Sequence, residues 1–494
     1  MIKRVRGDSM GKEANLAAIL EKEQAVFYQM SDRIWDYAEL AFAEVQSSAL
    51  QADFLEQAGF TLQRNLAAIA TAFMAEYTAP GQGKKPIIGI CGEFDALPAM
   101  SQKEDATHRE PLQEGGNGHA CGHHLLGTAG VAAAFALKQV LEKANLPGTV
   151  RYYGCPAEEG FSGKSFLDRA GVFADLDIAL CWHPQQYHCI EKSGALANIR
   201  LRYRFLGISA NPAHSGHLGR SALDAAELMN IGANYLREHM TPDARIHYAY
   251  EDAGGKAANV IPAQVEVNYC IRARKMQTVL DLKKRLDKIA QGAALMTETE
   301  VEGHVYAAYA DYIGNPVVEE RMACHLQNGL PLAYTPEEYA YAMAFRNGMG
   351  ENNMESVRRN YETIAGLQGA ALQEKLKQPI CDFLLPPLAS NGSTDFGDVS
   401  YHIPSGQFYA ACFPLGAPPH SWQACAVGKS AMAHKGMLLA AKVLAKTAWD
   451  FIENPALVPA AKKAMQAQGI TSYVSPIAKN VLPGGKICYD NKKG

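Results

Sequence analysis

The chain has 494 residues, of which 48% are hydrophobic and 20% charged, and its formal net charge is −4. This length predicts more than one domain, because domains usually hold about 100 to 200 residues. The composition is typical of a globular enzyme and excludes a disordered or fibrous chain. No long basic run favours a nucleic-acid or membrane-surface partner.

The N-terminal segment and the cysteines bear on the cellular compartment. Residues Met1–Lys12 are basic but lack a following apolar run, so they do not resemble a secretory signal. The apolar stretch Leu125–Leu137 is shorter than the roughly 20 residues that a membrane span needs, and it predicts a buried helix. The eleven cysteines form no compact framework, which indicates reduced thiols. We therefore expect a cytoplasmic protein without membrane contact.

The first predicted elements are helices, followed by strands that alternate with helices. Apolar residues recur at helical spacing over 13–66 and predict a helical opening layer. Short apolar runs predict buried strands over 86–90, 150–154 and 177–181, with a helix over 125–143. This alternation predicts an α/β domain with a mostly parallel sheet, whose functional groups gather where strands end.

A second pattern begins near Leu196, where three strands and two helices alternate in a compact α+β unit. After Asn315 the chain becomes helical again. We therefore divide the chain into a discontinuous larger domain, residues 1–196 and 313–494, and an inserted smaller domain, residues 197–312. The elements expected in the insertion are strands over 198–205 and 263–273, helices over 221–238 and 278–297, and a strand that ends near Val305.

The clearest chemical signal is the run His119–His124 (HACGHH), in a Gly-rich loop ahead of an apolar helix. A thiolate and an imidazole two residues apart on a loop make a good chelating pair. Glu158 and Glu159 follow a predicted strand, where one carboxylate can bind metal while its neighbour moves a proton. His183 and His420 would each be interpreted as structural if they stood alone. Several strand ends with ligand-type side chains favour a metal site instead.

Together these motifs resemble the dinuclear-metal aminoacylase and carboxypeptidase family, and the resemblance covers nearly the whole chain. It implies a zinc-peptidase-like catalytic domain, here 1–196 and 313–494, interrupted by a smaller lid domain that dimerises, here 197–312. The change of pattern near Leu196 agrees with this division. The matching segments are Gly92–Leu97 (GEFDAL), Gly118–His123 (GHACGH), Cys155–Gly160 (CPAEEG), Trp182–Pro184 (WHP) and His217–Ala225 (HLGRSALDA).

The resemblance implies a role for each matching side chain. It makes Glu158 the general base and Asp95 a carboxylate that orients a metal ligand by hydrogen bonding. Asn259 and Arg272 match lid positions that face the substrate. The implied metal ligands are Cys121, His123, Glu159, His183 and His420.

One lid position departs from the family pattern. The family's lid loop carries a His that reaches the active site of the partner subunit and helps to bind the oxyanion. An alignment without gaps between Gly207 and His217 puts Asn211 at this position, with His214 three residues later. Either Asn211 supplies a neutral donor, or His214 acts through a shifted loop, or the contact is weaker. His124 also stands where relatives often have Asp or Asn.

The resemblance implies hydrolysis of an amide bond in a small N-acyl or aryl-amide amino acid, or a dipeptide, that carries a carboxylate. A water held between two divalent metal ions, Zn or Mn, would have its pKa lowered from about 15.7 toward about 7. Glu158 would take its proton and pass it to the leaving nitrogen. Arg272 and Asn259 would hold the carboxylate. The expected assembly is a homodimer or a heteromer with a related subunit.

Two other function classes stay open at this point. In the first, the chain is a non-catalytic or partner-dependent subunit of a heteromeric hydrolase. The missing lid His motivates it, and the intact ligand set argues against it. In the second, Cys121 is the nucleophile of a cysteine hydrolase, with His119 or His123 as its base. That mechanism leaves the paired carboxylates and the two distant histidines without a purpose.

Overall fold

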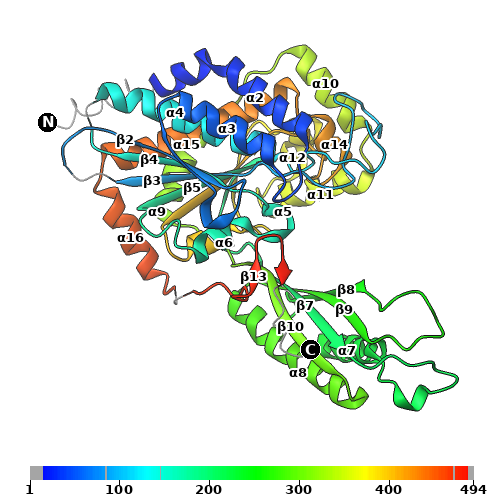
Figure 1. Cartoon of the computed structure of the whole chain (residues 1–494). Coiled ribbons are helices and arrows are strands. Elements are labelled where there is room, and N and C mark those ends of the chain that lie inside the picture. The colour runs from blue at the N-terminus through cyan, green and yellow to red at the C-terminus, as the bar shows by residue number, and fades with distance from the viewer. Residues whose placement is uncertain (1–14, 84–85, 145, 471–472, 488–494) are drawn as a thin grey trace. The chain divides into compact units, whose positions relative to one another are not determined.

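The computed structural model describes residues 15–83, 86–144, 146–470 and 473–487, which fall into two compact units (Figure 1). The larger unit holds the described residues up to Ser193, with Ile313–Ala389 and the described residues from Val399 to 470. The smaller unit holds Gly194–Tyr312, Ser390–Asp398 and the described residues from Tyr473 onward. The segment Met1–Lys12, for which we predicted no signal function, lies outside the described residues.

An eight-stranded sheet forms the centre of the larger unit. In spatial order its strands are β1 (Thr61–Arg64), β2 (Phe73–Thr78), β4 (Thr149–Gly154), β3 (Ile87–Gly92), β5 (Ile178–Gln185), β12 (Ser405–Ala411), β6 (His188–Glu191) and β11 (Leu384–Leu388). The central strands β4, β3, β5 and β12 run parallel, whereas β2 and β6 flank them in antiparallel pairs. The predicted α/β class with a mostly parallel sheet is therefore confirmed.

Two long apolar helices pack side by side over the central strands, α4 (His123–Ala144) and α15 (Ala431–Glu453) (Figure 1). Glycines permit this close approach, because a Cβ at Gly127 would collide with the carbonyl of Glu93 and one at Gly436 with the carbonyl of Ala411. By length and composition α4 could cross a membrane, but 89% of its most apolar window is buried inside the protein. It is thus the buried core helix that the sequence predicts.

The opening layer consists of helices, as predicted, and α2 (Gln24–Tyr37) and α3 (Val45–Gln57) pack on each other and on α4. The segment after 313 is mostly helical. Its main helices are α9 (Pro316–Asn328), α10 (Pro336–Asn347), α11 (Glu351–Thr363), α12 (Gly369–Lys377), α14 (Trp422–Ala426) and α16 (Leu457–Ala467).

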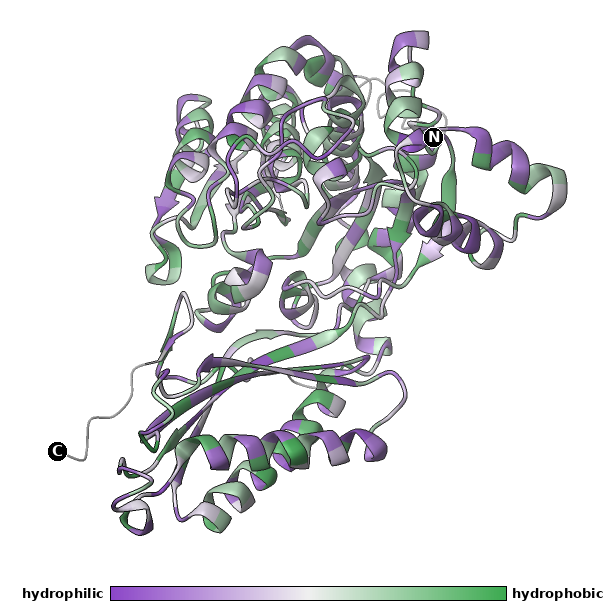
Figure 2. Cartoon of the chain, turned by 90° about the vertical axis from the view of Figure 1, so that its right-hand side faces the viewer, coloured by the Kyte–Doolittle hydropathy of each residue, from purple (hydrophilic) through white to green (hydrophobic). Residues whose placement is uncertain are grey.

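The smaller unit is an antiparallel sheet with two helices on one face (Figure 1). Its strands lie in the order β10 (Glu300–Tyr309), β7 (Ala197–Leu206), β9 (Gln264–Ala273) and β8 (Arg245–Asp252). The helices α7 (Ala222–Leu236) and α8 (Met276–Thr297) mix hydrophilic and hydrophobic residues (Figure 2) and pack on β7 and β9. Buried and half-buried residues alternate along β9, so Arg272 lies on the sheet face opposite the helices.

Several sequence predictions differ from the structure in detail. β5 continues to Gln185, so His183 lies inside a strand and not after one. We did not predict β8, because most of its residues are exposed and only Ile246 is buried. We also did not predict β12, because all its residues are buried, which removes the alternation that marks a strand.

The observed division also differs from the predicted one at the C-terminal side. We assigned 313–494 to one domain, but Ser390–Asp398 and the described residues from Tyr473 group with the smaller unit. Tyr473 donates a hydrogen bond to Asp398 at 2.7 Å, and Ala478 N donates to Val305 O at 3.1 Å. These contacts join segments far apart in sequence, which a local pattern cannot reveal.

A half-buried carboxyl group on α9 makes stability depend on pH. Burial raises the pKa of Glu319 from 4.5 to about 7. Between these values the folded protein binds a proton that the unfolded chain has released, so stability falls as pH rises through this window. We expect Glu319→Gln to stabilise the fold by about 1 to 2 kcal/mol at pH 8, discounted for partial exposure, and to have little effect at pH 4.5. Equal changes in unfolding free energy at both pH values would contradict this.

Candidate metal centre

Ligand-type side chains of the larger unit converge at the carboxyl ends of its parallel strands. Cys121 and His123 stand where the chain enters α4, and Glu159 lies in the turn after β4. His183 lies near the end of β5, and His420 lies in the loop after β12. Because β4, β5 and β12 run in the same direction, these five residues reach the same edge of the sheet.

The Cys121 sulfur lies between the other ligand candidates. Its Sγ is 3.3 Å from His183 Nε2 and 3.3 Å from His420 Nε2. His420 Nε2 lies in turn 2.9 Å from Glu159 Oε1. Two groups of three possible ligands, each with its ligand atoms within 4.8 Å of one another, share this sulfur. They are Cys121, His123 and His183, and Cys121, Glu159 and His420.

Asp95 holds two of these residues in position. The Nδ1–H group of His123 donates to Asp95 Oδ1 at 2.8 Å, which turns Nε2 toward the ligand cluster. The backbone N–H of Glu159 donates to Asp95 Oδ2, also at 2.8 Å. His183 is oriented similarly, because its Nδ1 lies 2.8 Å from the carbonyl oxygen of Pro184. Such hydrogen bonds fix the tautomer and direction of metal-binding imidazoles.

The turn that carries Glu158 and Glu159 has an unusual backbone. Ala157 and Ser162 have φ angles of 60° and 52°, in the left-handed region. Non-glycine residues in this region cost of order 1–3 kcal/mol and cluster at functional sites. The Glu44 carboxylate fixes the turn by accepting the N–H of Ala157 at 2.9 Å. The strain is thus held by a buried hydrogen bond, and the two adjacent carboxylates join different ligand groups.

A third group of possible ligands contains a residue that we did not predict. It joins Glu158 to His123 and Glu93. Glu93 is only 2% exposed; its Oε1 accepts from Lys164 Nζ at 2.5 Å, and its Oε2 lies 3.2 Å from His123 Nε2. The available sequence signal was its place two residues before Asp95, directly after a buried strand.

The electrostatics of the cluster keep its anionic ligands ionised. Burial and the Glu159 carboxylate raise the pKa of the Cys121 thiol, but His183 and His123 outweigh them and lower it to about 6. Burial also raises the pKa of Glu159, but the hydrogen bond from His420 lowers it to about 2. Metals bind the thiolate and the carboxylate, so both groups are in the required form near neutral pH.

The residues present fit divalent cations. Glu93 Oε2 and His123 Nε2 are buried and face each other, and neither atom has a hydrogen-bond partner among the described residues. An unsatisfied buried polar atom costs about 1–3 kcal/mol, which a cation beside it would offset. Thiolate, imidazole and carboxylate groups suit zinc, and the carboxylates also suit manganese.

Two histidines of the HACGHH run serve the core. His119 Nε2 lies 3.0 Å from the carbonyl oxygen of Ile34, and His124 Nε2 lies 2.9 Å from that of Gly428. Burial lowers the pKa of His124 to about 3 and holds that of His119 well below its usual range. A low pKa makes His119 a poor base for Cys121, which argues against the cysteine-nucleophile mechanism.

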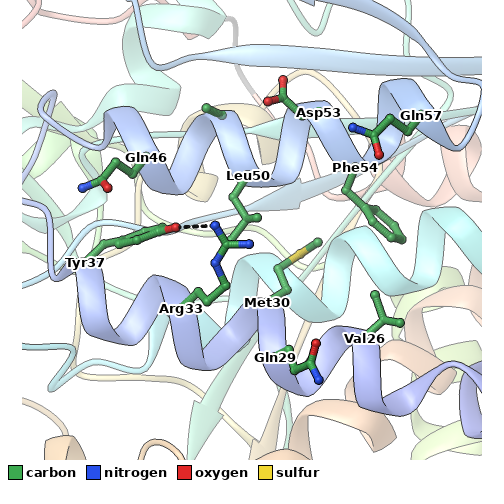
Figure 3. A pocket seen from close by; sticks show the side chains of 11 residues that line it. Val26, Gln29, Met30, Arg33, Tyr37, Gln46, Leu50, Asp53, Phe54 and Gln57 are labelled. Atoms are coloured by element: carbon green, nitrogen blue, oxygen red, sulfur yellow. Dashed lines mark hydrogen bonds between the residues drawn. The ribbon is translucent and has the colours of Figure 1, made fainter.

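A cavity of about 540 Å³ lies apart from this chemistry, between α2 and α3 (Figure 3). Arg33 and Tyr37 form a hydrogen bond of 2.8 Å in it. Its one carboxylate, Asp53, is 2.8 Å from Arg64, and its lining includes no His or Cys. It therefore offers no groups for metal-dependent hydrolysis.

The predicted lid residues belong to the smaller unit, so their roles at the metal centre stay predictions. Asn211 Oδ1 accepts the backbone N–H groups of Ala213 at 3.0 Å and His214 at 3.2 Å, and these bonds form a local turn. Asn211 and His214 are both exposed. Asn259 is exposed, and Arg272 is half-buried on β9.

Residues 89–486 match the family described as Peptidase family M20/M25/M40. The chain belongs to this family. As an M20 peptidase it is a hydrolase of amide bonds, so the predicted family, fold and enzyme class are confirmed. Among M20 relatives, a p-aminobenzoyl-glutamate hydrolase subunit of Escherichia coli (strain K12) is 42% identical over 470 residues, which cover 94% of this chain and 97% of that protein.

Two further M20 relatives are informative. Xaa-Arg dipeptidase of Mus musculus is 30% identical over 454 residues, which cover 89% of this chain and 88% of that protein. A solved Bacillus subtilis structure, described as a dinuclear metal binding peptidase from the M20 family, matches with a TM-score of 0.55 and 17% identity, over 88% of this chain and 99% of that one. The family thus includes dinuclear metal-binding peptidases.

Replacing Asp95 by Asn should loosen the metal ligands. The single amide oxygen of Asn cannot accept in the places of both carboxylate oxygens, so either His123 or Glu159 loses its anchor. We expect metal affinity to fall by about 10- to 100-fold, measured by competition with a chelator. Asp53→Asn, which changes an exposed carboxylate on α3, is the matched control. Wild-type affinity in Asp95→Asn would show that Asp95 does not orient the ligands.

Proposed function

We propose that this M20 peptidase is a dinuclear metal amidohydrolase that cleaves p-aminobenzoyl-glutamate or a related N-acyl amino acid or dipeptide. The observation that carries the proposal is the pair of ligand groups that share the Cys121 sulfur, with Glu158 beside them. The name of the bacterial relative supports an aryl amide of glutamate, and that of the mouse relative supports a dipeptide. The thiolate and imidazoles favour zinc, and manganese is the alternative.

In the proposed mechanism Glu158 moves the proton. Two divalent ions, when bound, would activate a water and polarise the amide carbonyl. Glu158 lies within the group that contains His123, so it can accept the proton of the attacking water and pass it to the leaving nitrogen. Asp95 keeps His123 and Glu159 in place during the reaction. Arg272, whose planar guanidinium suits a carboxylate, would hold the substrate together with Asn259.

We also propose that the chain works in the cytoplasm as a homodimer or as a heteromer with a related subunit. The bacterial relative is named as a hydrolase subunit, which supports a heteromer. Strand β8 forms one edge of the sheet in the smaller unit, and an edge strand can pair with a strand of another chain. Ten cysteines of the described part of the chain are free thiols, which suits a reducing compartment.

The purified chain, reconstituted with zinc or manganese, tests the proposal. We expect it alone to hydrolyse at least one member of a panel of p-aminobenzoyl-glutamate, N-acyl amino acids and dipeptides. A chelator should abolish turnover, and added metal should restore it. Turnover only after addition of a related subunit would favour the partner-dependent alternative. Turnover that survives complete metal removal would instead favour a thiol hydrolase.

The two adjacent carboxylates should differ in what their loss does. We expect Glu158→Gln to keep its metal but to lower kcat by about two to four orders of magnitude, the usual scale for a lost general base. Glu159→Gln should instead weaken metal retention about tenfold or more, because this carboxylate lies in the group with Cys121 and His420. Metal analysis of both variants is the measurement, and equal metal loss would refute this division of roles.

The lid loop offers two candidate oxyanion donors. We expect Asn211→Ala to lower turnover by about 10²-fold, the scale of one lost donor, and His214→Ala to cost less than about tenfold. Asn211→Asp separates catalysis from folding, because it keeps an oxygen for the turn made with Ala213 but removes the amide donor. It should be as impaired as the Ala variant. A crippled His214→Ala beside a near-normal Asn211→Ala would assign the role to His214.

A further inference from the structure

Glu93 and Lys164 form a buried ion pair that the proposed mechanism does not use. Their side chains are 3% and 0% exposed. Lys164 Nζ donates to Glu93 Oε1 at 2.5 Å, and the other oxygen, Oε2, is turned toward His123 Nε2 at 3.2 Å. The pair therefore ends at the nitrogen that Asp95 turns toward the ligand cluster by holding the other side of the ring.

A purely structural purpose explains this pair poorly. Removing two charges from water costs several kcal/mol per ion, and the attraction offsets that cost only when the remaining polar atoms are also satisfied. Here the Glu93 Oε2 and the His123 Nε2 are buried without a hydrogen-bond partner among the described residues. A cation within reach of both atoms would satisfy the two lone pairs at once.

We infer that Glu93 is a further metal ligand, on the His123 side of the centre, and that Lys164 holds its second oxygen. The inference rests on the proposed dinuclear function and adds one carboxylate to the five predicted ligands. Lys164 directs Glu93 to bind through one oxygen, and its positive charge offsets the added negative charge. Glu158, a member of the same group, then need not bind the metal and can serve as the base.

Metal affinity in two charge-matched variants separates a ligand from a structural partner. Glu93→Gln removes the carboxylate but leaves the Lys164 charge unpaired, whereas the double variant Glu93→Gln/Lys164→Met removes the whole ion pair. If Glu93 is a ligand, both should bind Co²⁺ at least about tenfold more weakly than wild type in chelator competition. If the pair is only structural, the double variant should recover wild-type affinity, which would overturn the inference.

A spectroscopic readout identifies the ligand directly. An imidazole reaches about as far as a Glu carboxylate, so Glu93→His in the Co²⁺ protein should add one solvent-exchangeable, hyperfine-shifted imidazole N–H signal to the wild-type proton spectrum. Glu191→His is the control, because Glu191 is equally buried but lies outside the ligand groups. An unchanged spectrum in a Glu93→His protein that binds two Co²⁺ overturns the inference alone. Absence of Co²⁺ binding in the wild type would instead overturn the proposed function.

Discussion

The position of one buried sulfur constrains the rest of the site. Cys121 has a short side chain, so groups that share its Sγ must be brought to it by their own segments. The fold does this with parallel strands whose ends deliver His183 and Glu159, and with a loop that delivers His420. The backbone N–H of His420 donates to the carbonyl oxygen of Ala120 at 2.8 Å, which ties that loop to the residue beside the sulfur.

The same convergence explains where the protein holds strain and buried charge. His420 and Ala157 both have φ angles of 60°, and both lie beside ligand-type side chains. Buried carboxylates stabilise these positions: Glu44 fixes the turn at Ala157, and Asp95 joins that turn to α4. All five predicted metal ligands lie in the larger unit, whose parallel sheet makes a rigid base for them. A preformed site of this kind can select a metal by its geometry and donor types.

Much of the site could be predicted from the sequence, because its ligands follow short apolar strands or lie in a compact motif. The resemblance placed Cys121 and Glu159, and the structure brings them together. Glu93 was missed because a carboxylate after a strand is usually solvated, and only the fold buries it against Lys164. β12 was missed because it has no polar alternation. The Asn211 turn depends on backbone hydrogen bonds that residue type alone does not reveal.

The central claim is that two metal ions share the Cys121 thiolate. X-ray absorption at the metal edge of the reconstituted chain tests it most directly. The account predicts a sulfur neighbour at about 2.3 Å and a second metal at roughly 3.5–4 Å, with the sulfur signal lost in Cys121→Ser. Nitrogen and oxygen neighbours alone, with no second metal nearby, would contradict it.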